Sequence, residues 1–304
     1  MSKRGVEKRH SETAMFAALY RAIANKEFKN QSLGSDDLAK YFLPSHFKFF
    51  IKFKTIRASV KNKSNKLTPG MYEYILARTA FFDTVFIDAL NKNISQIVLL
   101  GAGYDTRAYR FAKLNNPTQI FELDMATTQN RKKKCLKKAQ IDIPTPVRLV
   151  PIDFNKEELN NVLEKAGYEC NEKALFIWEG VSYYLEPKSV DATLEFVNRC
   201  SHHESVIAFD YAIAISKENI DNYYGVKVFA QTWKKHRSNE LLRFAIEDGQ
   251  IESFLEQRGL KIVNHLDNKE IEKTFLINTN RSLIGQITAL FRFAIASPDN
   301  KNET

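Results

Sequence analysis

Two glycines that follow an apolar stretch are the first residues of this chain whose types and spacing could do chemistry. Gly101 and Gly103 come directly after residues 97–100, which we expect to form a strand. Glycine has no Cβ atom, so backbone N–H groups beside it can approach a ligand closely. A dinucleotide-binding loop would carry a third glycine at position 106, where this chain has Thr106. The loop therefore favours a nucleoside cofactor without phosphates over a nicotinamide or flavin dinucleotide.

Acidic residues stand at the end of the next expected strand. Asp124 lies about 20 residues beyond the glycine loop, where a carboxylate is well placed to accept hydrogen bonds from two ribose hydroxyls. Glu122 precedes it by two positions, and side chains two apart in a strand point to the same face. Asp124 is the better candidate because it stands at the strand terminus. The alternative is that Asp124 is a surface acid or caps the following helix.

Two further strand ends carry candidate binding residues. Asp153 and Phe154 follow the third expected strand, where a carboxylate and an aromatic ring could grip an adenine. Asp153 could instead cap a helix that starts at Asn155. Glu179 and Gly180 follow the fourth strand, at the crevice where ligands bind in such sheets. Glu179 could receive a cationic ammonium group or lie near a sulfonium.

Short apolar runs alternate with helical stretches from Gln96 onwards, which is typical of a parallel α/β sheet with crossover helices. We expect strands at residues 97–100, 119–123, 147–151, 175–178, 205–211, 260–265 and 287–296. We expect helices at residues 106–114, 126–139, 156–167, 187–201 and 246–258. A polar helical insertion at about 212–243 follows the fifth strand.

The first 90 residues are expected to form a helical extension. We expect its helices at 13–23, 36–42 and 71–90, the first with an N-cap at Ser11, and a loop at 64–70. Phenylalanines alternate with lysines inside it, at Phe47, Phe49, Phe50 and Phe53. These aromatic side chains could contact a substrate or an anionic partner, or form an amphipathic helix that closes over the core, and we favour packing. We therefore divide the chain into a cap and lid at 1–90, a core at 91–298 and a tail at 299–304.

Composition narrows the class of protein. The net charge is +9, and its lysine runs are interpreted as a solvated helix face, so a nucleic-acid partner is not expected. Three widely spaced cysteines predict neither a disulfide framework nor a metal site, and reduced thiols fit a cytoplasmic protein. The first residues lack the apolar core of a signal peptide, and no segment is long enough to span a bilayer. We expect no membrane partner and leave the oligomeric state open.

The motifs together resemble the leucine carboxyl methyltransferase family, especially its bacterial branch of S-adenosyl-L-methionine-dependent methyltransferases. The family's G-A-G-x-D-T-R loop matches residues 101–107, its E-x-D strand end matches 122–124, and its E-G-x-x-x-Y-L segment matches 179–185. Its opening T-A…R-A helix and its R-T-x-x-x-D helix match residues 13–22 and 78–83. The resemblance covers most of the chain and implies a Rossmann-like, seven-stranded methyltransferase sheet.

The resemblance also implies a role for each candidate in binding S-adenosyl-L-methionine. Arg78 would bind the methionyl carboxylate as a charge-assisted partner, and Glu179 would lie at the same methionyl end. Gly101 and Gly103 would shape the pocket, and Asp124 would bind the ribose. Asp153 and Phe154 would bind the adenine. The family has Asp-Leu where this chain has Asp153-Phe154, and the insertion that usually shapes the acceptor site departs most from the family.

Methyl transfer from a sulfonium is an in-line displacement, in which the protein mainly aligns the acceptor with the methyl group and excludes water. By the resemblance we expect O-methyl transfer to a carboxylate or hydroxyl of a small molecule. A carboxylate needs no general base, whereas a hydroxyl would benefit from one. We assign no catalytic residue, but Tyr183, Tyr184, Asp210 and Tyr211 near the strand ends are candidates.

Three alternatives stay open from the sequence. One is carboxyl methylation at a protein C-terminus. Another is methylation of a carboxyl group on a tRNA base side chain. This second alternative is disfavoured because the chain lacks room for the extra domain of the related tRNA-modifying enzyme. The third is a non-catalytic protein that binds S-adenosyl-L-methionine. The presence of Arg78, Asp124 and Glu179 argues against this last option.

Overall fold

One mixed sheet forms the centre of the computed structural model, which describes residues 12–28, 34–236 and 242–299. Its strand order is β3-β2-β1-β4-β5-β8-β7, with β6 paired to the end of β5. The strands are β1 (Gln96–Leu100), β2 (Gln119–Asp124), β3 (Val147–Pro151), β4 (Ala174–Trp178), β5 (Val206–Ala214), β6 (Ile246–Glu247), β7 (Leu260–Leu266) and β8 (Phe291–Pro298). Only β8 runs antiparallel to its neighbours β5 and β7. The predicted α/β class is therefore confirmed, with the short β6 as an addition.

The chain reverses its direction of strand addition beside β1. It proceeds from β1 outward to β2 and β3, then returns to place β4 on the other side of β1. All five side chains of β1 are buried, as expected for a central strand that is covered on both faces. In an open parallel sheet, such a reversal leaves a crevice beyond the carboxyl ends of the strands. The expected binding residues follow β1, β2, β3 and β4 at this edge.

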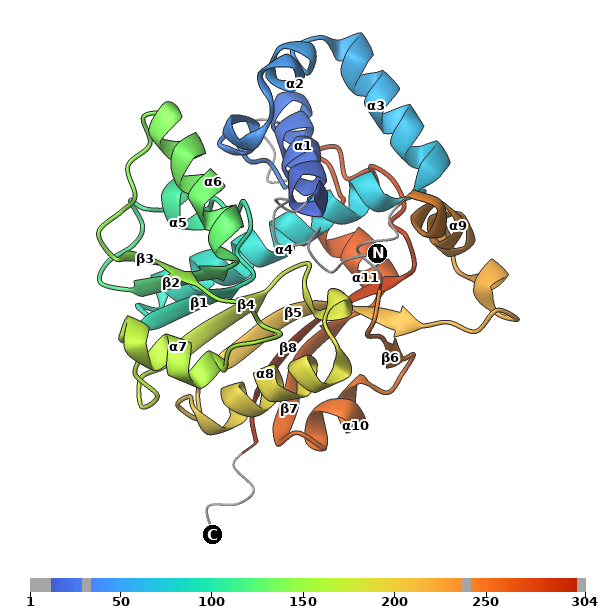
Figure 1. Ribbon diagram of the computed structural model, residues 1–304. Coiled ribbons are helices and arrows are strands. Elements are labelled where there is room, and N and C mark those ends of the chain that lie inside the picture. Colours follow the sequence, from blue (N-terminus) through green and yellow to red (C-terminus); the bar gives the residue numbers. More distant parts are fainter. Residues whose placement is uncertain (1–11, 29–33, 237–241, 300–304) are drawn as a thin grey trace, which may run out of the picture.

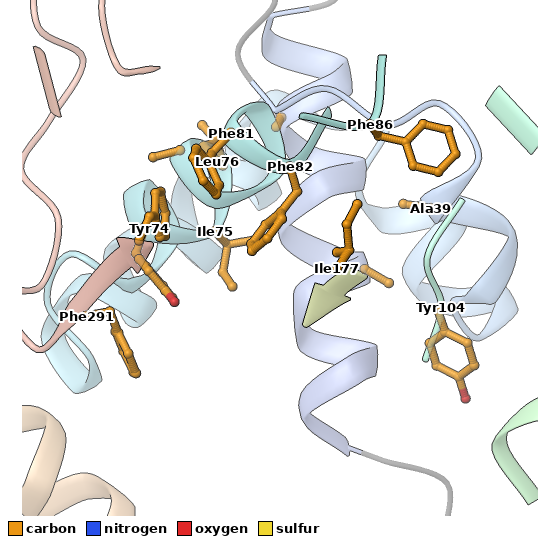
Figure 2. Close-up of a cluster of buried hydrophobic side chains, with 14 of the residues drawn as sticks. Ala39, Tyr74, Ile75, Leu76, Phe81, Phe82, Phe86, Tyr104, Ile177 and Phe291 are labelled. Atoms are coloured by element: carbon orange, nitrogen blue, oxygen red, sulfur yellow. The ribbon is translucent and has the colours of Figure 1, made fainter. Parts of the chain in front are cut away.

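Helices cover both faces of the sheet (Figure 1). The helices α7 (Leu159–Ala166), α8 (Pro187–Arg199) and α10 (Ile251–Glu256) contribute to one buried cluster. The helices α4 (Met71–Asn91), α5 (Arg107–Arg110), α6 (Ala126–Lys138) and α11 (Asn268–Phe275) contribute to the other. Figure 2 shows how α4 joins this second cluster, in which Phe82 and Ile75 of α4 and Ile177 of β4 take part. This packing fixes α4 against the central strands.

The N-terminal segment builds a helical layer beyond α4. It contains α1 (Glu12–Glu27), the 3-10 turn η2 (Ala39–Phe42), α2 (Ser45–Phe50) and α3 (Lys54–Leu67). Figure 1 shows α2 and α3 at the top of the view, far from the sheet, and α9 (Val226–His236) beside the end of α3. The short turns η3 (Ser182–Tyr184) and η4 (Ile220–Asn222) follow β4 and β5. No helix in the described ranges is both long and apolar enough to cross a membrane.

Several expected boundaries were wrong. The loop expected at 64–70 begins only after Leu67, because α3 continues through polar residues and the Thr68 N–H bonds to the Ser64 carbonyl at 2.7 Å. The helix expected at 246–258 is shorter, and β6 occupies its first residues. The last strand begins at Phe291 instead of residue 287. The expected cap at Ser11 lies outside the described residues.

The expected packing of the phenylalanine–lysine segment was also wrong for most of its aromatic side chains. Phe47 packs against the core, but Phe49, Phe50 and Phe53 remain exposed. The reason is geometric: α2 has only six residues and ends at the turn before α3, so its far end extends past the rest of the molecule. These exposed rings therefore need another explanation.

Candidate functional site

A cavity of about 870 Å³ lies where the carboxyl ends of the central strands meet the N-terminal helices. This volume falls within the roughly 300–1,000 Å³ typical of small-molecule sites. One end, which we call the strand end, is lined by Gly101, Gly103, Asp124, Phe154 and Glu179. The other, which we call the helical end, is lined by side chains of α1, α2, α3 and α9 and by the start of α4, whereas Arg78 of α4 lies beside Glu179 at the strand end. One cavity thus offers a polar wall and an apolar wall.

Asp124 is held in place by the glycine loop. Its Oδ2 accepts a hydrogen bond from the Gly103 N–H at 2.7 Å, and its Oδ1 accepts one from the Met125 N–H at 2.7 Å. Burial raises the pKa of Asp124 above its ordinary value, although these two N–H donors oppose the shift. Gly103 has a φ of 47°, which favours glycine, and its position brings the loop backbone against the carboxylate. The result is a rigid acceptor at the cavity wall.

Glu179 lies between two buried guanidinium groups. Its Oε1 accepts from Arg78 Nε at 3.0 Å, and its Oε2 accepts from Arg107 Nη1 at 2.7 Å. Burial would raise the pKa of Glu179, but Arg107 and Arg78 outweigh it, so the net pKa is lowered. Glu179 is therefore ionised at neutral pH. Its carboxylate lines the strand end between the two arginines.

Arg107 is the residue that the sequence interpretation missed. Its side chain is 1% exposed, and besides Glu179 it binds Asp83 of α4, at 2.8 Å from Nε, and Asp105 of the glycine loop. A guanidinium group suits this position because its planar, five-donor fork can serve several carboxylates at once. The motif G-A-G-x-D-T-R already contained Asp105 and Arg107. What it could not show was that one arginine joins three acidic residues from three elements.

Asp210 of β5 forms a second buried cluster beside Arg78. Its Oδ1 accepts from the Gly180 N–H at 2.6 Å, and its Oδ2 accepts from the hydroxyl of Tyr74 and lies 3.4 Å from Arg78 Nη1. Tyr183 adds a longer contact, with its hydroxyl 3.4 Å from the same oxygen. Burial raises the pKa of Asp210, and Arg78 opposes the shift. Asp210 does not line the cavity, so it positions its neighbours instead of touching a ligand.

Gly180 lets Arg78 approach the chain after β4. Its φ is 73°, and an added Cβ atom would lie 2.9 Å from Arg78 Nη1. Arg78 uses Nε and Nη1 for its partners, whereas Nη2 has no hydrogen bond within the described residues. Arg78 lines the cavity. It therefore retains a donor that an anionic ligand group could use.

Thr106, which replaces the third glycine of a dinucleotide loop, has a structural partner. Its hydroxyl donates to Asp36 Oδ2 at 2.7 Å, and both residues are buried. Arg21 of α1 lies 3.2 Å from the same carboxylate and donates to the Tyr104 carbonyl at 2.7 Å. These contacts attach α1 and the segment before η2 to the glycine loop.

The structure brings most of the expected residues to the cavity but leaves three of them away from it: Asp210, described above, Asp153 and Tyr211. Asp153 does not line the cavity: its Oδ1 accepts from the Asn155 N–H at 3.1 Å, and its Oδ2 lies 3.1 Å from Lys156 Nζ. Asp153 therefore caps a turn, and the helix that the alternative placed at Asn155 begins only at Leu159. Tyr211 points to the opposite face of the sheet, where its hydroxyl lies 2.9 Å from His265 Nε2. Tyr183 and Tyr184 do line the cavity.

Glu122 shows why only one acid of the second strand end faces the cavity. It is buried, and its Oε2 accepts from Lys132 Nζ of α6 at 2.6 Å. The ion pair is 1% exposed on both sides. Glu122 thus anchors α6 to β2, whereas Asp124 at the strand end remains available to a ligand.

The fold and this cavity define a Rossmann-like S-adenosyl-L-methionine-dependent methyltransferase, and comparison with known proteins supports this class. The leucine carboxyl methyltransferase family model matches residues 14–198, and the chain belongs to this family. It is 34% identical over 212 residues to YktD of Bacillus subtilis, which is assigned as an S-adenosyl-L-methionine-dependent methyltransferase. That match covers 68% of this chain and 67% of the relative.

Other similarities are shorter or structural. A protein of Mycolicibacterium smegmatis with the same assignment is 30% identical over 61% of this chain and 62% of its own length, so the chain spans less than two thirds of that relative. A methyltransferase-like crystal structure from Thermobifida fusca superposes with a TM-score of 0.60 at 15% identity, over 97% of both chains. A Streptomyces avermitilis structure gives 0.57 at 11% identity, over 96% of this chain and 99% of that one. These two structures support the fold alone.

Proposed function

We propose that the protein transfers a methyl group from S-adenosyl-L-methionine to an oxygen of a small molecule, with a carboxylate as the favoured acceptor. The observation that carries this proposal is the division of the cavity. Its strand end presents ionised and hydrogen-bonding groups suited to a nucleoside amino acid, and its helical end presents apolar and aromatic side chains. Two ligands of different chemistry can thus meet in one cavity.

The strand end fits the cofactor group by group. Asp124 would accept from the ribose hydroxyls, because the loop N–H groups fix its position and its carboxylate lines the cavity. Arg78 would donate from Nη2 to the methionyl carboxylate, and Glu179 would face the ammonium group. Phe154 lines the same wall and would cover the adenine. When bound, the cofactor supplies an electrophilic methyl group on a cationic sulfur.

The helical end indicates an acceptor that is already anionic. Tyr183 lines the cavity, but burial raises the pKa of Tyr183 well above its ordinary value, and Asp210 adds to the shift. Its hydroxyl therefore stays protonated at neutral pH and can donate a hydrogen bond but cannot accept a proton efficiently. No histidine lines the cavity within the described ranges. A carboxylate oxygen needs no base, so this wall suits it better than an alcohol.

A cation lies where such a carboxylate would enter. Lys63 of α3 lines the cavity, is exposed and has no ion pair within the described part of the chain, whereas the cavity's Arg243 pairs with Glu186. The rest of this wall is mainly apolar and aromatic and includes Phe16, Tyr20, Phe47, Phe229 and Trp233. We infer an organic acid with an apolar body as the acceptor class.

Two measurements test this proposal. Calorimetric titration with S-adenosyl-L-methionine should give saturable heat, and no binding at about 1 mM cofactor would contradict the cofactor site. A labelled-methyl screen against metabolite, peptide and RNA pools should yield a base-labile ester among the small acids. Label in peptide or RNA would instead support one of the macromolecular alternatives, and cofactor binding without any product would support a non-catalytic protein.

Lys63 provides a sharper test once an acid acceptor is known. Lys63→Met should raise the KM for that acid about two- to fivefold with kcat unchanged, because an exposed ion pair contributes up to about 1 kcal/mol. Lys66→Met is the matched control, since Lys66 is also exposed on α3 but does not line the cavity. Equal effects of both substitutions would contradict a specific role for Lys63.

A further inference from the structure

The positive charge of this protein is concentrated in one segment. Residues 38–72 contain eight cations and no acidic residue, so they carry +8 of a net charge of +9. The cations are Lys40, Lys48, Lys52, Lys54, Arg57, Lys61, Lys63 and Lys66. Arg57 and Lys61 pair with Glu27, but the other six have no ion pair within the described part of the chain. This segment forms η2, α2, α3 and the start of α4.

Exposed aromatic side chains lie among these cations. Phe49, Phe50 and Phe53 are 54%, 46% and 48% exposed, and the Phe49 ring lies 5.8 Å from that of Phe50 and 5.4 Å from that of Phe53. Ile56, which is 36% exposed, follows at the start of α3. We call these four residues with Lys52 and Lys54 the α2–α3 tip. A contiguous apolar group of this kind on a protein surface indicates an interaction site.

The location of the tip supports contact with a large, flat partner. Figure 1 shows α2 and α3 at the extremity of the molecule opposite α7, α8 and α10. About half of each of the three rings is exposed, so they can contact a surface without any rearrangement of the core. The inner sides of the same helices line the cavity through Phe47, Val60 and Leu67. The tip is therefore directly connected to the helical end of the cavity.

We propose that the α2–α3 tip binds the surface of a membrane that contains anionic lipids. Aromatic side chains insert favourably at the boundary between headgroups and acyl chains, and nearby lysines attract anionic headgroups with about 1 kcal/mol each. Such binding needs an amphipathic surface and not a spanning segment. The sequence expectation of no membrane partner was based on the lack of a signal-peptide core and of a spanning segment, so it does not address this mode. An acidic protein would match the lysines but leaves no specific reason for three exposed rings.

A stripe of three apolar residues and one lysine leads from this surface into the cavity. Ile56, Val60, Lys63 and Leu67 recur at helical spacing along α3, so they share one face. The last three line the cavity and Ile56 belongs to the tip. If the acceptor is an amphiphilic acid, which rests on the proposed function, this stripe offers its route from the lipid surface. The membrane contact itself does not depend on any methyl transfer.

The experiment is co-sedimentation of the full chain with vesicles of phosphatidylcholine alone or mixed with phosphatidylglycerol. We expect binding only to the anionic vesicles at about 0.1 M salt, and loss of most of it at about 1 M, where charges are screened within a few ångströms. Phe49→Ser/Phe53→Ser and Lys52→Glu/Lys54→Glu should each weaken binding at least about tenfold. All four positions are exposed, so the unfolding free energy should change by less than about 0.5 kcal/mol per site.

Matched controls separate the tip from overall charge and hydrophobicity. Lys165→Glu/Lys188→Glu changes the net charge equally on α7 and α8, and Leu114→Ser/Val263→Ser removes exposed apolar side chains elsewhere. These variants should bind within twofold of the wild type. Equal binding to both vesicle types, no binding to either, or equal losses in the controls would overturn the proposal. The proposal would also be overturned if a polyglutamate peptide bound the wild type and lost its binding in the tip variants while no vesicles bound. The surface would then recognise acidic protein.

Discussion

Arg107 Nη1 lies 2.7 Å from Glu179 Oε2, and this contact joins the glycine loop after β1 to the end of β4 across the reversal point of the sheet. Both side chains are buried, at 1% and 10% exposure. The pair therefore does two things at once: it fixes the orientation of a carboxylate at the cavity wall, and it connects the two strands between which the cofactor would lie.

Replacement of Arg107 should destabilise the fold strongly. Arg107→Met would leave Glu179, Asp105 and Asp83 without their shared cation, and removal of one partner from a buried ion pair costs about 3–5 kcal/mol. Arg107→Lys should recover only part of this, because an ammonium group lacks the planar fork. Urea unfolding measures the effect. Arg199→Met removes an exposed pair with Glu195 and should cost less than about 1 kcal/mol, so comparable losses at both sites would refute the central role of Arg107.

Glu179 should contribute stability that depends on pH. Burial raises its pKa, but Arg107 and Arg78 outweigh burial, so the folded-state pKa lies below the unfolded value of 4.5. A carboxyl group with a depressed folded-state pKa stabilises the protein fully above the unfolded pKa and loses that contribution as the pH falls through the folded pKa. The difference in unfolding free energy between the wild type and Glu179→Gln should be constant from pH 7 to about pH 5 and shrink below 4.5. A difference that grew on acidification would reverse the assigned sign.

The central strands could be predicted because each is a short apolar run between polar segments, but apolar character alone misplaced the last one. Ile287, Ala289 and Leu290 are buried, yet they precede β8. The Ala289 N–H bonds to the Tyr224 carbonyl at 2.9 Å, so this stretch satisfies its backbone outside the sheet. The helix α11 was missed although its signal was present, since Asp267 and Glu270 form a capping box at its start.

Candidate residues at strand ends were predictable from position, whereas contacts between distant elements were not. Asp124 and Glu179 stand where the carboxyl ends of strands meet. Parity predicts that only one of Asp210 and Tyr211 faces the site, because neighbours in a strand point to opposite faces, and the structure shows that Asp210 is the one beside Arg78. The convergence of Asp83, Asp105 and Glu179 on Arg107 depends on how α4 packs on the sheet, and no spacing along the chain encodes it.

Asp124 and Asp153 should differ sharply in their importance for the cofactor. Asp124→Ala removes the carboxylate that the glycine loop holds at the cavity wall, and should weaken S-adenosyl-L-methionine binding at least about tenfold, because hydrogen bonds to charged groups contribute about 1.5–3 kcal/mol. Asp153→Ala removes a turn cap outside the cavity and should change the affinity less than about twofold. Calorimetric titration of both variants decides the matter. A tenfold loss in Asp153→Ala would restore the adenine-binding role that the family resemblance implied.

Gly180 should be required for the position of Arg78, and Gly249 provides a control with the same backbone strain. Both residues have φ near 80°, at 73° and 80°, so alanine costs about 1–2 kcal/mol of conformational energy at either site. At Gly180 the new Cβ would also lie 2.9 Å from Arg78 Nη1, while at Gly249 no atom lies within 4 Å. Gly180→Ala should therefore displace the guanidinium group and weaken S-adenosyl-L-methionine binding at least about tenfold, or about 1.4 kcal/mol. Gly249→Ala should lower the unfolding free energy by a similar strain term but leave the cofactor affinity unchanged. Equal affinities in the two variants would show that the close approach of Gly180 to Arg78 does not matter for binding.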